Sequence, residues 1–231
     1  MRTLVVNTFL TLDGVMQAPG GPEEDPSDGF RYGGWSAPLW DDAMGEVMGD
    51  VMGTPFDLLL GRRTYEIFAA HWPFADERAA RGGEDSGVDV EAAAALNSAR
   101  KYVASRTLDR VDWNNSVLLE GDVVEAVAEL KRQPGPEIQV HGSADLLQTL
   151  LRTDLVDELS LFTFPVVVGR GKRLFGDGTA PTGMRVVDAK VFGTGVVWAR
   201  YARAGDVDVG SFAFEDPTEE EAKRREKLAR E

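Results

Sequence analysis

The sequence contains no cysteine, which excludes disulfide bonds and thiolate zinc sites and removes any need for an oxidising compartment. Its only histidines, His71 and His141, are too few for a histidine metal site, so no metal is expected. No stretch approaches the roughly 20 apolar residues of a membrane helix, and the N-terminal segment lacks the cleavage site of a signal peptide. We therefore expect a soluble, cytoplasmic protein without a membrane partner.

Two common site motifs are also missing, and basic residues are scarce. There is no G-x-S-x-G hydrolase elbow, and Gly169-Arg170-Gly171 lacks the third glycine of a G-x-G-x-x-G dinucleotide fingerprint. Because 25 Lys and Arg residues face 39 Asp and Glu residues, the formal net charge is -14. This charge repels nucleic-acid phosphates, so no nucleic-acid partner is expected. An anionic ligand would need a local cluster of basic side chains.

Short β-rich runs alternate with helical patterns along the 231 residues, a length that suffices for one sizeable core. The first six runs predict a mostly parallel sheet, and Gly193-Thr194-Gly195 predicts the turn of a C-terminal antiparallel hairpin. The predicted fold class is therefore α/β. The expected strands are residues 3–9, 56–60, 101–104, 116–119, 137–141, 158–164, 184–192 and 196–202.

Helices are expected from Trp40 onward and over residues 62–70, 122–131 and 144–152. Residues 18–34 and 76–89 are rich in glycine and charge and predict surface loops, either of which could cover a site. The acidic residues of the first loop lack calcium-loop spacing and are expected to be solvated; they are Glu23, Glu24, Asp25 and Asp28.

We expect residues 1–203 to form one domain and residues 204–231 a charged tail. The tail contains acid-before-base pairs at i,i+4 and almost no apolar side chains, a pattern typical of a solvated helix. Asp216 followed by Pro217 predicts the start of this helix. A helix that binds a partner is the alternative.

Three predicted strands run into segments suited to binding phosphate. These segments are Gly61-Arg62-Arg63-Thr64, Ser105-Arg106 and Gly142-Ser143. In open α/β sheets, ligands bind beyond the carboxyl ends of the strands, where glycine permits close backbone approach and arginine gives bidentate contacts to anions. Together the segments predict a dinucleotide site. Their arginines favour NADP(H), because arginine accommodates the 2′-phosphate that NAD(H) lacks.

A set of motifs, in order along the chain, resembles the dihydrofolate-reductase-like superfamily. Within it, the chain is most similar to stand-alone relatives of the C-terminal reductase domain of RibD, the bifunctional deaminase-reductase of riboflavin biosynthesis. The motifs are Thr11-Leu12-Asp13-Gly14, Gly33-Gly34-Trp35, Leu60-Gly61-Arg62-Arg63-Thr64-Tyr65-Glu66, Ser105-Arg106-Thr107-Leu108, His141-Gly142-Ser143 and Leu155-Val156-Asp157-Glu158-Leu159.

The resemblance implies a three-layer fold with about eight strands, NADPH as the hydride donor, and a homodimer. The cofactor-binding residues would be Gly61, Arg62, Arg63, Thr64, Ser105, Arg106, Gly142 and Ser143. The zinc deaminase half of the bifunctional enzyme requires cysteine ligands, so this chain would perform the reduction step alone.

The resemblance also implies that Asp13, Trp35, Trp40 and Asp41 line the substrate pocket. Asp41 is the first candidate for orienting or protonating the substrate, and Asp13 is the second. Each also has a structural interpretation: Asp13 precedes Gly14 as turn residues do, and Asp41 lies where the dipole of the following helix favours an acid.

Three functions remain open from the sequence. The first is NADPH-dependent reduction of a small heterocycle such as 5-amino-6-(5-phosphoribosylamino)uracil, and the second is reduction of dihydrofolate. The third is a non-catalytic, nucleotide-binding regulatory or scaffolding protein. Binding of NADPH would favour the first two, and its oxidation in the presence of either substrate would separate them from the third.

Overall fold

The computed structural model describes residues 1–75, 87–213 and 216–230, and its centre is one eight-stranded sheet. The strands are β1 (Leu4–Thr11), β2 (Phe56–Gly61), β3 (Lys101–Ala104), β4 (Ser116–Leu118), β5 (Glu137–Val140), β6 (Glu158–Phe164), β7 (Gly183–Val191) and β8 (Val197–Gly205). Their order is β4-β3-β2-β5-β1-β6-β8-β7. β1 to β6 pair in parallel, whereas β8 is antiparallel to β6 and β7. The α/β class, the mostly parallel sheet and the C-terminal hairpin are confirmed.

The helices fall on both faces of this sheet and in the tail. They are α1 (Asp42–Met52), α2 (Arg62–His71), α4 (Gly87–Ser98), α5 (Val123–Arg132), α6 (Ala144–Leu151) and α7 (Glu219–Leu228). Single 3-10 turns lie at Ser27–Gly29, Ala37–Leu39 and Trp72–Phe74. The helix expected from Trp40 begins two residues later, because Trp40 has extended backbone and Asp41 is the N-cap.

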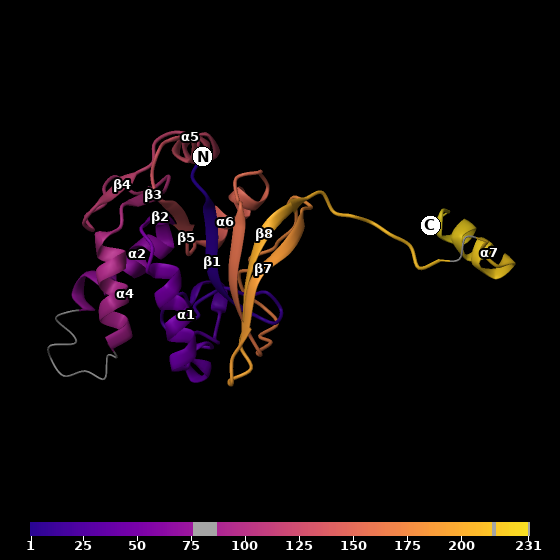
Figure 1. Cartoon of the computed structure of the whole chain (residues 1–231), viewed down its shortest axis with the longest axis horizontal. Helices are drawn as coiled ribbons and strands as arrows, with labels where there is room; N and C mark the ends of the chain where they lie inside the picture. Colours follow the sequence, from indigo (N-terminus) through magenta and orange to yellow (C-terminus); the bar gives the residue numbers. More distant parts are fainter. Residues whose placement is uncertain (76–86, 214–215, 231) are drawn as a thin grey trace.

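Alternating side chains on the strands divide the core between the two faces. Leu59 packs with residues of α5 and α6, whereas its neighbours Leu58 and Leu60 pack with residues of α2 and α4. α1 covers the same face as α2 and α4 further along the sheet, where Met44 meets Phe162. The result is three layers, and Figure 1 shows α1, α2 and α4 side by side.

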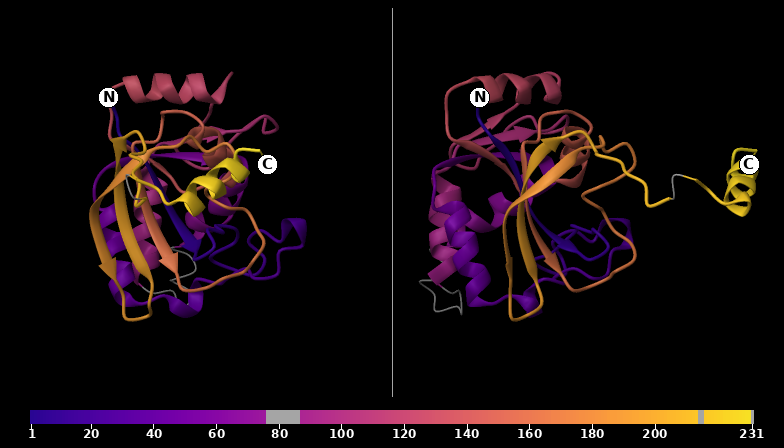
Figure 2. Two further views of the ribbon diagram at one scale, coloured as in Figure 1. Left: turned by 90° about the vertical axis from the view of Figure 1, so that its right-hand side faces the viewer. Right: turned by 45° about the vertical axis from the view of Figure 1, so that its right-hand side comes forward.

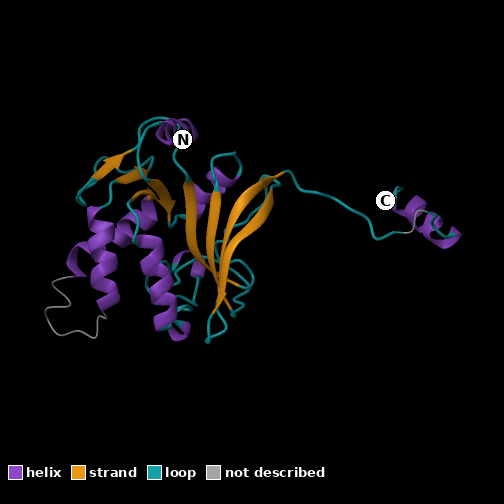
Figure 3. Ribbon diagram, in the orientation of Figure 1, coloured by secondary structure: helices purple, strands orange, loops and turns teal. Residues whose placement is uncertain are grey.

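The hairpin of β7 and β8 differs from the parallel part of the sheet. Most of β7 is exposed, and in Figure 3 the helices gather toward the parallel strands while the hairpin lies at the other end of the sheet. A three-residue turn at residues 193–195 links its strands, with Gly195 at φ 85° where a side chain would be strained. The described part of the chain contains no helix that is both long and apolar enough to cross a bilayer.

Two predicted boundaries are wrong. Residues 87–89 belong to α4 rather than to the loop expected at 76–89, since the helix of the alanine-rich run starts at Gly87; residues 76–86 lie outside the described residues. The N-cap of α7 is Thr218, whose hydroxyl accepts a hydrogen bond from the Glu221 N–H, and not Asp216. α7 has no buried residue, and an extended segment separates it from the sheet (Figures 1 and 2).

Candidate functional site

The parallel sheet brings the three predicted phosphate-binding segments to one edge. β3, β2 and β5 are neighbours, so their carboxyl ends lie side by side. Gly61 at the end of β2 pairs with Ala104 at the end of β3, and the Gly61 N–H donates to the Gly142 carbonyl at 3.1 Å. Residues that are 81 positions apart in the sequence therefore touch at the start of α2 and α6.

The two glycines at this junction are required by the close approach of the backbones. A Cβ on Gly61 would overlap the hydroxyl of Ser143, and a Cβ on Gly142 would lie 2.5 Å from Oγ1 of Thr64. Gly142 also has φ 154°, and the Gly142–Ser143 peptide is cis. Both glycines are buried, so their missing side chains let the starts of α2 and α6 pack against each other, with both helix N-termini at the same edge of the sheet.

The polar side chains of the predicted cofactor site make different contacts. Arg62 is exposed and lies 3.4 Å from Glu66, one turn along α2. The Ser105 hydroxyl accepts hydrogen bonds from the N–H groups of Thr107 and Leu108 at 3.1 and 3.0 Å, and Arg106 is exposed. Ser105 therefore shapes its own turn, whereas both arginines lie at the surface.

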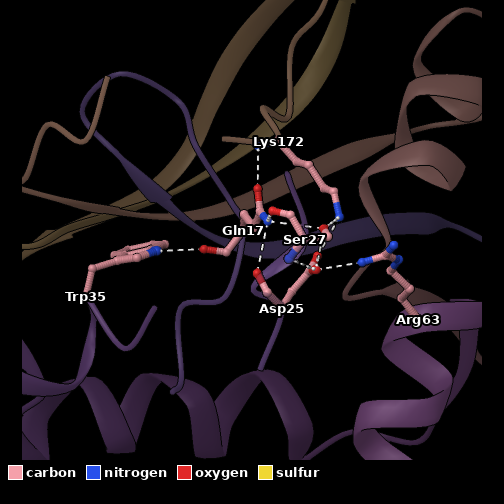
Figure 4. A network of polar contacts seen from close by, with 6 residues as sticks. All are labelled: Gln17, Asp25, Ser27, Trp35, Arg63 and Lys172. Carbon is pink, nitrogen blue, oxygen red and sulfur yellow. Dashed lines mark hydrogen bonds and ion pairs between the residues drawn. The ribbon is translucent and has the colours of Figure 1, made fainter. Parts of the chain in front are cut away.

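Arg63 belongs to a polar cluster that the sequence did not predict. Its Nη1 lies 2.6 Å from Oδ1 of Asp25, and the other oxygen of Asp25 lies 2.5 Å from Nζ of Lys172 (Figure 4). The Ser27 hydroxyl donates to Asp25 at 2.6 Å and accepts from Lys172 at 2.8 Å. We call Asp25, Ser27, Arg63 and Lys172 the Asp25 cluster; it joins residues from the long loop after β1, α2 and the loop after β6.

The expectation that Asp25 is solvated is wrong, because only 12% of its side chain is exposed. The amide of Gln17, itself buried, donates to the carbonyl oxygens of Asp25 and Ser27 at 3.0 and 3.1 Å. The Trp35 indole N–H in turn donates to the Gln17 carbonyl at 2.8 Å (Figure 4). The loop is therefore anchored from inside, a contact set that no local sequence pattern signals.

Two cavities flank the Asp25 cluster. One of about 410 Å³ is lined by Glu24, Asp25, Pro26, Ser27, Arg62, Arg63, Glu66 and Ile67. The other, of about 250 Å³, is lined by Gln17, Ser27, Asp28, Phe30, Arg170, Gly171 and Lys172. Neither of them includes the predicted substrate residues Asp13, Trp35, Trp40 and Asp41.

Asp13 is held in the turn after β1 with both carboxylate oxygens engaged. They accept from the Thr11 hydroxyl at 2.6 Å and from the N–H groups of Val168 and Gly169 at 3.2 and 2.8 Å, and they pair with Arg173 at 3.2 Å. Desolvation favours the neutral acid, but these hydrogen bonds outweigh it and lower the pKa of Asp13 to about 2. At neutral pH this carboxylate has no proton to donate.

Asp41 keeps one oxygen unused. Its Oδ1 accepts from the Met44 N–H at 2.9 Å as the N-cap of α1, while among the described residues Oδ2 makes no hydrogen bond. Trp40 beside it is 38% exposed, whereas Trp35 is buried and its ring packs edge-on against Phe164. The structure thus leaves Asp41 and Trp40 accessible and makes Trp35 part of the core.

Polar groups also lie on the sheet face that α1 covers. Burial lowers the pKa of His141 to about 4, so its ring is neutral at pH 7, and Nε2 lies 3.1 Å from Oε1 of Gln139. The Gln139 amide donates to the Val51 carbonyl of α1 at 3.0 Å. Asn7, buried on β1, has no hydrogen-bond partner for its amide among the described residues. No sequence motif singled out Asn7.

Comparison with known proteins identifies the family of this chain. The family model described as the RibD C-terminal domain matches residues 2–198. The chain belongs to this family. Two uncharacterized proteins of Bacillus subtilis (strain 168) are similar to it. YyaP is 28% identical over 204 residues, covering 87% of this chain and 94% of YyaP; YwjB is 26% identical over 208 residues, covering 88% and 99%.

Solved structures share the fold. A protein from Shewanella sp. PV-4 named for riboflavin biosynthesis matches with a TM-score of 0.57 and 21% identity, covering 87% of this chain and 99% of that one. A pyrimidine reductase-like protein from Corynebacterium diphtheriae matches with a TM-score of 0.55 and 14% identity, covering 89% and 93%. The likeness to these structures concerns the fold, and membership of the family supports a reductase-like function.

Proposed function

We propose that this protein is an NADPH-dependent reductase of a small heterocycle, with 5-amino-6-(5-phosphoribosylamino)uracil as the first substrate to test. The observation that supports it best is the junction of β2, β3 and β5, where Gly61 and Gly142 bring the N-termini of α2 and α6 together at the carboxyl ends of the strands. Arg62 and Arg63 lie at the same edge as this junction and line one cavity. A homodimer is part of the proposal only through the family.

The residues at this edge fit a dinucleotide. Gly61 and Gly142 allow the N-termini of α2 and α6 to lie against each other, and the unpaired N–H groups of helix N-termini are donors to phosphate oxygens. Arg63 adds a cation on the first turn of α2. When bound, NADPH would supply a hydride from its nicotinamide ring, and the protein would supply orientation and a proton.

Among the two acidic candidates, the contacts favour Asp41. Asp13 is ionised and fully hydrogen-bonded, so its contribution would be to hold the turn. Asp41 has a free Oδ2 beside the accessible Trp40, and this oxygen could hold a substrate N–H or pass a proton to it. Its catalytic role remains a prediction.

A non-catalytic, nucleotide-binding protein is the second candidate. It is favoured by one observation: Asp41 already acts as a helix cap and Asp13 as a turn anchor, so each acid has a structural role without substrate. Under this alternative NADPH binds but is not oxidised with any heterocycle.

Titration with NADPH and NADH, followed by tryptophan fluorescence and thermal shift, tests the binding step, because a ligand of the native state raises the apparent stability. We expect Arg63→Ala to weaken NADPH binding by about 10-fold or more and NADH binding much less, since a hydrogen bond to a charged group contributes about 1.5–3 kcal/mol. Arg132→Ala, which removes an exposed arginine from α5, is the matched control and should change neither affinity. Absence of a shift with both nucleotides would refute the proposal.

Turnover is tested by following the loss of NADPH absorbance at about 340 nm in the presence of the aminopyrimidine or of dihydrofolate. Asp41→Asn should lower kcat by about 100-fold while NADPH binding is kept, a loss in the range of general acid catalysis. The control is Asp42→Asn, the exposed acid next in the chain. Binding without oxidation by the wild-type protein would favour the non-catalytic alternative.

A further inference from the structure

The Asp25 cluster brings two cationic side chains and a hydroxyl group to one anionic centre. Arg63 and Lys172 contact different oxygens of Asp25, at 2.6 and 2.5 Å, and Ser27 contacts both Asp25 and Lys172. The three partners come from separate parts of the chain and converge from different directions (Figure 4). The Asp25 carboxylate is therefore the anion on which these three side chains converge.

The surroundings of Asp25 favour its ionised form. Partial burial raises the pKa of Asp25, but the hydrogen bonds and charge of Lys172 and the hydrogen bonds of Ser27 outweigh it and leave the pKa below its usual value. The other acids at the cavity are turned elsewhere: Glu24 accepts from the N–H groups of Gly20 and Gly21, and Glu66 pairs with Arg62. If the Asp25 carboxylate left, neither Glu24 nor Glu66 would take its place between Arg63 and Lys172.

The Asp25 carboxylate also accepts from the Ser27 N–H at 3.3 Å, but the loop is held in addition by contacts that do not depend on this carboxylate. Gln17 holds the loop through the main-chain carbonyls of Asp25 and Ser27, and the Lys172 N–H donates to the Gln17 side chain at 3.1 Å. These contacts do not involve the Asp25 carboxylate. Rotation of the carboxylate into the adjoining cavity of about 410 Å³ would free the cations while Ser27 and Lys172 stay in place.

We infer that Arg63, Lys172 and Ser27 form a phosphate-binding site, and that Asp25 is its internal occupant, which an incoming phosphate monoester displaces. A phosphate has more oxygens than a carboxylate and up to two charges, so it can accept from all three side chains at once. Lys172 and Ser27 are thereby assigned to ligand binding, and Asp25 weakens the binding of any anion that cannot compete with it.

This inference deepens the proposed function and rests on it for the identity of the ligand. The phosphate could be the 2′-phosphate of NADPH or the ribosyl phosphate of a substrate. NADPH, NADH and ribose 5-phosphate are therefore titrated separately. A change for NADPH but not NADH assigns the site to the cofactor, and a change for ribose 5-phosphate alone assigns it to the substrate.

The test measures the affinity of each probe for the wild-type protein and for Asp25→Asn and Lys172→Met. We expect Asp25→Asn to tighten binding of the phosphate-bearing probe by about 5- to 10-fold, since it removes the competing charge, and Lys172→Met to weaken it by at least 10-fold. Glu23→Gln, an exposed position on the same loop that lines neither cavity, makes the same change of charge and should have no such effect. Lys190→Met, an exposed lysine of β7, is the control for Lys172.

Unchanged affinities for all three probes in both variants would overturn the inference. If Asp25→Asn fails to fold, Lys172→Met alone decides the matter, because it leaves the pair of Arg63 and Asp25 intact. If the wild-type protein binds neither nucleotide, the proposed function fails, but ribose 5-phosphate and inorganic phosphate still test the site: each should stabilise Asp25→Asn against heat and should not stabilise the double variant with Lys172→Met.

Discussion

Asp13 and Asp25 lie 12 residues apart on the long segment after β1, and both carboxylates are engaged on each oxygen. Asp13 accepts chiefly from backbone N–H groups and a neighbouring hydroxyl, which belong to the fold and cannot leave. Asp25 contacts the ends of two long cationic side chains, which under our inference can exchange this carboxylate for a phosphate. The same residue type therefore supports structure at one position and can act as a replaceable ligand at the other.

The comparison predicts the largest effect at Asp13. We expect Asp13→Ala to lower the free energy of unfolding by on the order of 3 kcal/mol, because it leaves the Val168 and Gly169 N–H groups without their acceptor. Asp25→Asn should cost about 1 kcal/mol or less, since its partners remain partly hydrated. Urea unfolding at neutral pH measures both, and equal losses would contradict the distinction.

The effect of Asp13 should also depend on pH in a defined direction. Its pKa is about 2 in the folded protein and near 3.8 when unperturbed, so its stabilisation is complete above about pH 4 and is lost as the pH falls toward 2. Acid unfolding of Asp13→Ala and the wild type should therefore converge as the pH approaches 2. A constant difference between them down to pH 2 would argue against the low pKa.

A smaller effect on stability than that of Asp13 is expected at His141. This histidine lies at the end of a strand, and its ionisation also changes stability with pH. The unfolded chain takes up a proton near pH 6.5, but the folded protein does so only near pH 4, so stability should fall between these values. We expect His141→Gln to remove on the order of 2 kcal/mol of this decline, measured by urea unfolding from pH 7 to 4.5. Parallel pH profiles would show that folding does not lower the pKa of His141.

The smallest effect is expected from removing residues 206–231. α7 buries no residue, so its deletion should change the free energy of unfolding by less than about 0.5 kcal/mol and should leave the affinity for NADPH unchanged. This deletion sets the baseline against which Asp13 and Asp25 are compared. A large loss of stability would mean that the tail has a partner, such as a second copy of the chain.

The parallel strands were predictable because their signals are local. The residues from Leu58 to Leu60 are continuously apolar, as strands covered on both faces are, and all three phosphate segments follow runs that are at least mostly apolar. The start of α7 was misplaced because two caps were possible within three residues, and the threonine hydroxyl reached the N–H of Glu221. Gly61 and Gly142 were correctly predicted to lie at the carboxyl ends of the strands. Their contact with each other could not be predicted from either segment.

The sequence by itself determined the class of fold, the family and the strand ends that could meet a dinucleotide, since periodicity, turn residues and motifs act over a few neighbouring positions. Only the tertiary structure decided that Asp25 meets Arg63 and Lys172, which are 38 and 147 residues away. It also separated Asp13, hydrogen-bonded on both oxygens, from Asp41, which keeps one free. The sequence determines which side chains carry charge, but tertiary packing determines which partners each charged side chain contacts.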